Sequence, residues 1–219
     1  NDYTFQRWVP GAGAVAWTLE LAAPGAVDCV FIAAHNLSGV LVTIATSPNL
    51  VDAFTDAVAI TPADNTTICA LFNDAGSPVT TQRLRISLDD GTGVAVGVIR
   101  AGVALQMAAP FYNGHKPATL QRVTEARQQF SESGQWLGRQ IQRRAIGAEY
   151  SWTHLPRAWY ASDFEPFAQT VPLSPFGIAG NPLRMTDDVA WCWTDTDLKP
   201  SLMGVNEYVQ VSMNVTGYW

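Results

Sequence analysis

The chain has 219 residues, of which 47% are hydrophobic and only 15% are charged, against about 25% charged residues in an average globular protein. This length allows one large or two small domains whose core needs no disulfide or metal for support. The net charge of −6 argues against nucleic acid as a partner. No apolar run of about 20 residues predicts a membrane span, and residues 1–10 lack the apolar segment of a signal peptide.

The first half of the chain predicts short strands separated by Gly, Pro, Asn and Asp turns. We expect strands at residues 15–21, 28–34, 40–45, 68–72, 83–88, 94–99 and 103–107, and one helical turn at 49–56. In the segment 83–88 apolar and polar residues alternate, so Leu84, Ile86 and Leu88 are expected to face a core. Many short strands with frequent turns favour a jelly-roll-like β-sandwich over residues 1–109.

A boundary is predicted at Ala108-Ala109-Pro110, after which the chain is more basic. Residues 110–219 are expected to form a β-rich unit with long strands and one or two short helices. The long strands are predicted at 119–129 and 135–153, the helices within 156–170, and a last strand near the end of the chain. The fold class is therefore mainly β.

The middle of the chain carries a local positive charge. Residues 1–110 hold four Lys/Arg and nine Asp/Glu, whereas residues 111–157 hold seven Lys/Arg and three Asp/Glu. This distribution indicates either a solvated β-ribbon or a site for an acidic partner. On a regular strand Arg139 and Arg143 would share one face and Arg144 would lie on the other. These three arginines are candidate contacts with a neighbouring subunit.

Residue types that carry catalysis are sparse and have no recognisable spacing. The three cysteines, Cys29, Cys69 and Cys192, sit among apolar residues and are expected to be buried, reduced thiols, as in a reducing cytoplasm. The three histidines, His35, His115 and His154, show no metal-ligand spacing. We therefore expect no cofactor, no metal and no enzymatic activity. Two acidic pairs, Asp187/Asp188 and Asp195/Asp197, leave open a hydrolase that acts on cell wall or a calcium site, although solvated loops are the simpler interpretation.

Aromatic residues gather in the second half and at the end of the chain. Trp152, Trp159, Tyr160, Phe164 and Phe167 fall within sixteen residues, and the chain ends in Tyr218-Trp219. Exposed aromatics of this kind would suit a carbohydrate-binding module that engages a host surface glycan. A helix-on-sheet core or a subunit interface is the alternative that helical spacing favours. Trp159, Tyr160 and Trp219 are accordingly candidate interface residues.

Several short motifs follow one another in order along the chain. The first is an apolar strand that runs into His35-Asn36-Leu37, and the second is the strand 83–88 followed by the apolar segment 94–105. Downstream come Tyr112-Asn113-Gly114-His115-Lys116-Pro117, then Ser131 with Gly134, Gly138 and Arg139, then Trp159-Tyr160 with Phe164-Glu165-Pro166-Phe167. The last are Pro175-Phe176 and the segment 187–191. Taken together and in this order, the motifs resemble those of a family of tailed-phage virion proteins. The segment after Phe176, Gly177-Ile178-Ala179-Gly180, departs from the aromatic-rich pattern of that family.

The resemblance implies an N-terminal half like the discoidin or galactose-binding jelly roll, and no catalytic residues. It implies a non-enzymatic structural subunit of a tail, tail tip or baseplate, assembled in the host cytoplasm and located in the virion. The expected partners are copies of the chain itself and other tail proteins. A glycan remains an alternative ligand.

Overall fold

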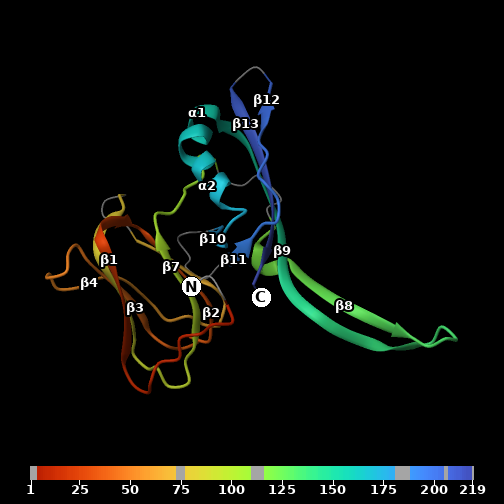
Figure 1. Cartoon of the computed structure of the whole chain (residues 1–219), viewed down its shortest axis with the longest axis horizontal. Helices are drawn as coiled ribbons and strands as arrows, with labels where there is room; N and C mark the ends of the chain where they lie inside the picture. The colour runs from red at the N-terminus through yellow and green to blue at the C-terminus, as the bar shows by residue number, and fades with distance from the viewer. Residues whose placement is uncertain (1–3, 73–76, 110–115, 181–187, 205–206, 219) are drawn as a thin grey trace. The chain divides into compact units, whose positions relative to one another are not determined.

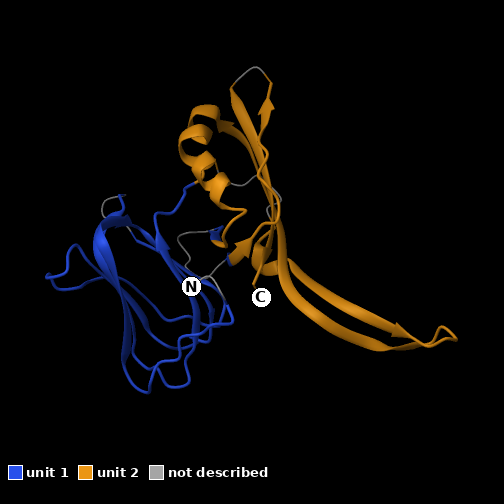
Figure 2. Ribbon diagram, viewed as in Figure 1, with its two compact units in different colours: residues 1–106, 177–190 blue, residues 107–176, 191–219 orange. Residues whose placement is uncertain are grey.

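The computed structural model describes residues 4–72, 77–109, 116–180, 188–204 and 207–218. The chain divides into two compact units, which Figure 2 colours separately. Unit 1 comprises Asn1–Gln106 and Gly177–Ala190, and unit 2 comprises Met107–Phe176 and Trp191–Trp219. The fold is mainly β, as predicted.

Unit 1 contains the seven strands of a β-sandwich. They are β1 (Val15–Val27), β2 (Cys29–His35), β3 (Val42–Ser47), β4 (Thr55–Ile60), β5 (Ile68–Leu71), β6 (Val79–Leu88) and β7 (Val96–Gly102). One sheet has the strand order β1-β6-β3-β4 and the other has the order β5-β2-β7 (Figure 1). All the pairings within these two sheets are antiparallel.

The core of unit 1 follows from the alternation of apolar residues along its strands. Leu84, Ile86 and Leu88 are each only 2% exposed, as predicted from their spacing. They join Ile44 of β3 and Ile32 of β2 in one hydrophobic cluster, so both sheets contribute to it. Burying each such side chain stabilises the fold by about 1.5–3 kcal/mol, which makes this cluster the main support of the sandwich.

Two local predictions for unit 1 were wrong. Residues 103–107 form no strand, because the chain turns away after β7 and the Ala104 amide donates to Oδ1 of Asp28 at 2.7 Å. Residues 49–56 form no helical turn; Asn49 folds its side chain back instead, and its Oδ1 accepts from the amides of Val51 and Asp52. This local hydrogen bonding, typical of Asn in turns, competes with a helix.

Unit 2 is built around long antiparallel strands. Its strands are β8 (Arg122–Phe130), β9 (Trp136–Pro156), β12 (Ser201–Met203) and β13 (Tyr208–Gly217), preceded by the short helix η1 (Ala118–Leu120). The strands β10 (Phe176–Ala179) and β11 (Val189–Trp193) complete a six-stranded sheet with the order β10-β11-β13-β9-β8, in which β12 also pairs with β13. The predicted strands 119–129 and 135–153 correspond to β8 and β9.

Three short helical pieces follow β9 without a break. They are α1 (Arg157–Trp159), the π-helix η2 (Tyr160–Phe164) and α2 (Glu165–Thr170). Phe164 is 1% exposed, and its ring lies 5.4 Å from that of Tyr160 and 5.6 Å from that of Phe167. Pro166 lies in the first turn of α2, where its missing N–H costs no helical hydrogen bond. The helices are therefore held by an aromatic cluster, as predicted.

The second segment of unit 1 departs from the predicted division at 109/110. The first crossing between the units lies close to that boundary, at 106/107, but residues 177–190 return to unit 1. Val189 packs with Cys29 and Cys69, and the backbone of Gly177 lies so near Phe31 that an added Cβ would be 2.3 Å from the ring. Gly177 and Val189 are small enough to allow this close approach. The return of the segment to unit 1 therefore depends on contacts between residues that are distant in the sequence.

Candidate interaction ribbon

The part of unit 2 with the most unusual exposure is a two-stranded ribbon. We define it as β8, residues 136–146 of β9 and the turn at 131–135 between them; the rest of β9 pairs with β13. Figure 1 shows the ribbon extending away from the remaining strands of unit 2. The turn is well formed, because Ser131 and Gln135 are hydrogen bonded and Gly134 adopts φ of 79°, which favours glycine.

Side chains on both faces of the ribbon are exposed. Eight of the nine residues of β8 are exposed, and β9 becomes buried only from Ala145 onward. A two-stranded hairpin by itself is only marginally stable in water, because neither face covers apolar surface. The ribbon therefore has the properties of a segment that is stabilised by a partner.

The free end of the ribbon carries large apolar side chains. Phe130 and Trp136 are directly opposite each other in the register and are 57% and 63% exposed. Leu137 follows at 64%. Aromatic side chains that are exposed together at the end of a projecting element are typical of interface anchors. These three residues were not among the predicted interface candidates, although apolar residues on both sides of a polar turn are a visible signal.

A β-bulge in β9 changes the side on which its arginines lie. Ala126 is opposite Ile141 and Glu125 is opposite Arg143, so Gln142 is an extra residue. The alternation therefore shifts by one residue between Arg139 and Arg143. The prediction that Arg139 and Arg143 share a face with Arg144 opposite was wrong, because it assumed a regular strand. Arg139 and Arg144 lie on the same face, and Arg143 lies on the other.

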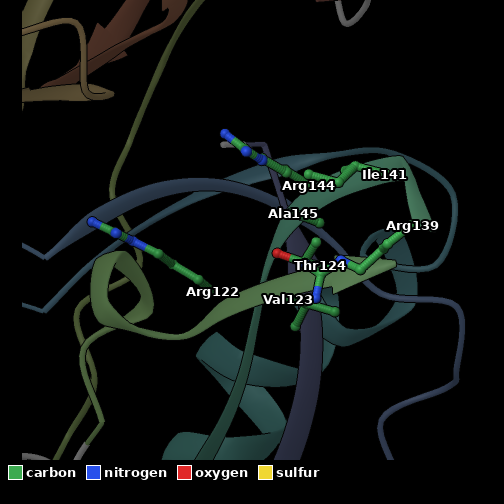
Figure 3. A pocket seen from close by; sticks show the side chains of 7 residues that line it. All are labelled: Arg122, Val123, Thr124, Arg139, Ile141, Arg144 and Ala145. Atoms are coloured by element: carbon green, nitrogen blue, oxygen red, sulfur yellow. The ribbon is translucent and has the colours of Figure 1, made fainter. Parts of the chain in front are cut away.

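The face with Arg139 and Arg144 contains a hollow of about 270 Å³. The hollow is lined by Arg122, Val123, Thr124, Arg139, Ile141, Arg144 and Ala145 (Figure 3). Figure 3 shows the guanidinium ends of Arg122 and Arg144 extending toward the same side. Within the described residues, no carboxylate forms an ion pair with Arg139 or Arg144. This arginine face is therefore suited to carboxylates supplied by another molecule.

The opposite face has a different charge pattern. Nη2 of Arg143 donates to Oε1 of Glu125 at 2.6 Å, across the two strands. Both side chains are about half exposed, at 51% and 50%, so the pair stabilises the ribbon by no more than about 1 kcal/mol. The bulge at Gln142 thus places Arg143, which is paired with Glu125, on one face together with Arg127, and places Arg139 and Arg144 on the other face.

The remaining interface candidates lie elsewhere in unit 2. Tyr160 is buried at 8% exposure, and Trp159 is half-buried with its ring 6.1 Å from that of Phe164. Burial, with a hydrogen bond to Glu165, raises the pKa of Tyr160 to about 12. These two residues belong to the aromatic core around Phe164. Trp219 lies outside the described residues.

All three cysteines and two of the three histidines lie in the described residues. All three cysteines are buried, as predicted, and Sγ of Cys29 lies 3.6 Å from Sγ of Cys69. The hydrogen bond between these thiols, together with burial, raises the pKa of Cys29. His35 is buried at the end of β2, and His154 contacts Thr153 and the ring of Tyr208. His115 and Asp187 lie outside the described residues.

In the described residues, no three His, Cys, Asp or Glu side chains are close enough together to hold a metal ion. Asp195 and Asp197 are exposed. No helix in the same part of the chain is long and apolar enough to cross a membrane. Comparisons with models of protein families, with curated proteins and with solved structures found no match.

Proposed function

We propose that the chain is a non-enzymatic structural subunit of a tailed-phage particle, placed in the tail, tail tip or baseplate, and that the ribbon attaches it to neighbouring subunits. The phage assignment is supported by the ordered motifs that resemble virion proteins. The attachment role is supported by one observation above all, which is a two-stranded ribbon whose faces are both exposed and whose end carries Phe130, Trp136 and Leu137.

The chemistry of the ribbon favours a protein partner. Three large apolar side chains at the end need a desolvated pocket, which a protein surface supplies. The arginine face needs carboxylates, and residues 1–110 of a neighbouring copy carry nine Asp/Glu against four Lys/Arg. The net charge of −6 would oppose long-range attraction to DNA. Contacts of the arginines would mainly set the register and choice of partner, because exposed ion pairs contribute about 0–1 kcal/mol each.

Incorporation into particles tests this proposal. In a host that produces the particle, a tagged copy of the chain should be recovered in purified particles by mass spectrometry. Leu137→Ser at the end of the ribbon should lower incorporation severalfold, because it removes an anchor without touching a core. Leu202→Ser is the matched control, since Leu202 is 66% exposed but lies in β12, outside the ribbon. Absence of the wild-type chain from particles, or equal incorporation of both variants, would refute the proposal.

A further inference from the structure

The strand β8 ends its sheet and has an open edge. In the strand order β10-β11-β13-β9-β8, β8 is the last strand, and within the described residues only β9 pairs with it. Its nine residues therefore present one row of backbone N–H and C=O groups that β9 does not use. Such an edge readily pairs with a strand from another chain.

A β-bulge, one of the usual protections of an edge, is missing from β8 but present on the other edge of the ribbon; the charged residues of β8 are Arg122, Glu125 and Arg127. β8 contains no proline, no lysine and no extra residue. The exposed edge of β9, in contrast, is interrupted by the two extra residues Leu137 and Gln142. Bulges of this kind hinder pairing along an edge. The ribbon thus offers a single regular edge.

The sequence of β8 is complementary to itself. When two copies of one strand pair antiparallel about a two-fold axis, one residue lies opposite its own copy and the others pair symmetrically around it. Ala126 is the middle residue of β8, which runs Arg-Val-Thr-Glu-Ala-Arg-Gln-Gln-Phe. With Ala126 on the axis, Glu125 lies opposite the partner's Arg127, and Arg127 lies opposite the partner's Glu125.

We propose that two copies of this chain join through their β8 strands, antiparallel and with Ala126 on the two-fold axis. The two ribbons then form one continuous four-stranded sheet. This inference rests on the proposed function, in which the ribbon is an attachment element, and it identifies a second copy as the occupant of its open edge.

Charge selects this register among its neighbours. Placing Glu125 on the axis would put it opposite the partner's Glu125, and placing Arg127 there would put two arginines opposite each other. Like charges directly opposite in a sheet are destabilising, whereas opposite charges stabilise it. The Ala126 register is also the one that pairs all nine residues of β8.

The existing ion pair with Arg143 leaves the other side of Glu125 facing the proposed partner strand. Oε1 of Glu125 accepts from Arg143 on the β9 side. The partner's Arg127 would approach from the opposite side, so Glu125 would lie between two guanidinium groups. Across the joint sheet, Arg143, Glu125 and the partner's Arg127 would form one row of alternating charge, and the two-fold axis generates a second.

On the arginine face, the proposed pairing places no two like charges directly opposite each other. Thr124 would lie opposite the partner's Gln128, and Arg122 opposite the partner's Phe130, where a cation can contact the ring. Arg144 and the partner's Arg139 would lie at the two ends of the row that contains Thr124 and the partner's Gln128. They would be three strand spacings, or about 14 Å, apart. At physiological salt the screening length is about 8 Å, so their repulsion is weak.

Cysteine cross-linking tests the register in the purified full-length chain. Ala126→Cys should give a disulfide-linked dimer on mild oxidation with oxidised glutathione, because residue 126 meets its own copy. Gln129→Cys is the matched control, since residue 129 would face the partner's Val123 and should remain unlinked. Failure of Ala126→Cys to cross-link, or equal linkage of both variants, would overturn the register.

A charge exchange tests the pairing itself by light scattering. Arg127→Glu alone places Glu opposite Glu, and Glu125→Arg alone places Arg opposite Arg, so each variant should dimerise about tenfold more weakly than the wild type. A mixture of the two variants restores opposite charges in both rows and should dimerise again. Lys199→Glu is the control for Arg127→Glu, because it makes the same charge change outside the ribbon. No weakening of the single variants, or no recovery in the mixture, would contradict the proposal.

These results separate the pairing from the proposed function. If cross-linking and charge exchange fail while Leu137→Ser still lowers incorporation into particles, the β8 pairing is wrong and the structural role stands. If the dimer forms as described but the chain is absent from particles, the structural role is wrong and the pairing stands.

Discussion

The buried imidazole of His35 predicts that acid weakens unit 1. His35 is 5% exposed, and its Nδ1 accepts a hydrogen bond from the amide of Leu37 at 3.2 Å. Burial lowers the pKa of His35 from 6.5 to about 4; weaker effects of Thr66 and Asp64 raise it, and Arg7 lowers it. Protonation would place a charge in the core and would remove the acceptor at Nδ1.

The direction and size of the effect follow from these two pKa values. Between pH 6.5 and 4 the unfolded chain binds the proton more strongly than the folded chain, so stability falls as the pH falls through this range. At pH 4.5 this difference in proton binding lowers the free energy of unfolding by about 2.5 kcal/mol relative to pH 7. His35→Asn keeps an acceptor near the position of Nδ1 but does not titrate, so it should lose this part of the pH dependence.

Urea unfolding at pH 7 and pH 4.5 measures the effect. The change in unfolding free energy between the two pH values should be about 2.5 kcal/mol smaller in His35→Asn than in the wild type. Carboxylates titrate in both proteins, so their contribution cancels in this difference. An equal change in the two proteins would refute the role of His35, because it would show that the imidazole is not held neutral by burial.

Three further substitutions test the fold and the ribbon. Leu84→Ala should lower the unfolding free energy by about 2–5 kcal/mol in urea titration, whereas Leu202→Ala should change it by less than about 0.5 kcal/mol. Gly177→Ala should destabilise unit 1 by about 1–3 kcal/mol, because its Cβ would lie 2.3 Å from the ring of Phe31; an unchanged melting curve would contradict this. Arg143→Gln should lower the unfolding free energy by less than about 1 kcal/mol, since its ion pair with Glu125 is half exposed. A larger loss would contradict this and indicate that Arg143 takes part in a wider network of ion pairs.

The sandwich strands could be predicted from the sequence because burial of one face leaves a clear alternation. Leu84, Ile86 and Leu88 of β6 show it, and outside the sandwich so do Val209 and Val211 of β13. β4 was missed, because as an edge strand it has no fully buried residue and its apolar pattern is weak. The return of residues 177–190 to unit 1 depends on contacts distant in sequence, such as that between Gly177 and Phe31, which have no local signal.

The ribbon could be predicted in outline but not in its surface chemistry. The two long strands and the basic stretch were visible in the sequence. The positions of Arg139 and Arg144 on one face depend on the extra residue Gln142, and no residue pattern marks that bulge. A period of two is valid only within an unbroken ladder, so a single extra residue reverses every assignment beyond it.

Electron cryomicroscopy of the assembled particle tests the central claim most directly. The chain should occupy repeated positions in the tail, tail tip or baseplate, with Phe130, Trp136 and Leu137 buried against a neighbouring subunit. Particles that contain the chain with its ribbon free in solvent, or particles that lack the chain, would contradict it.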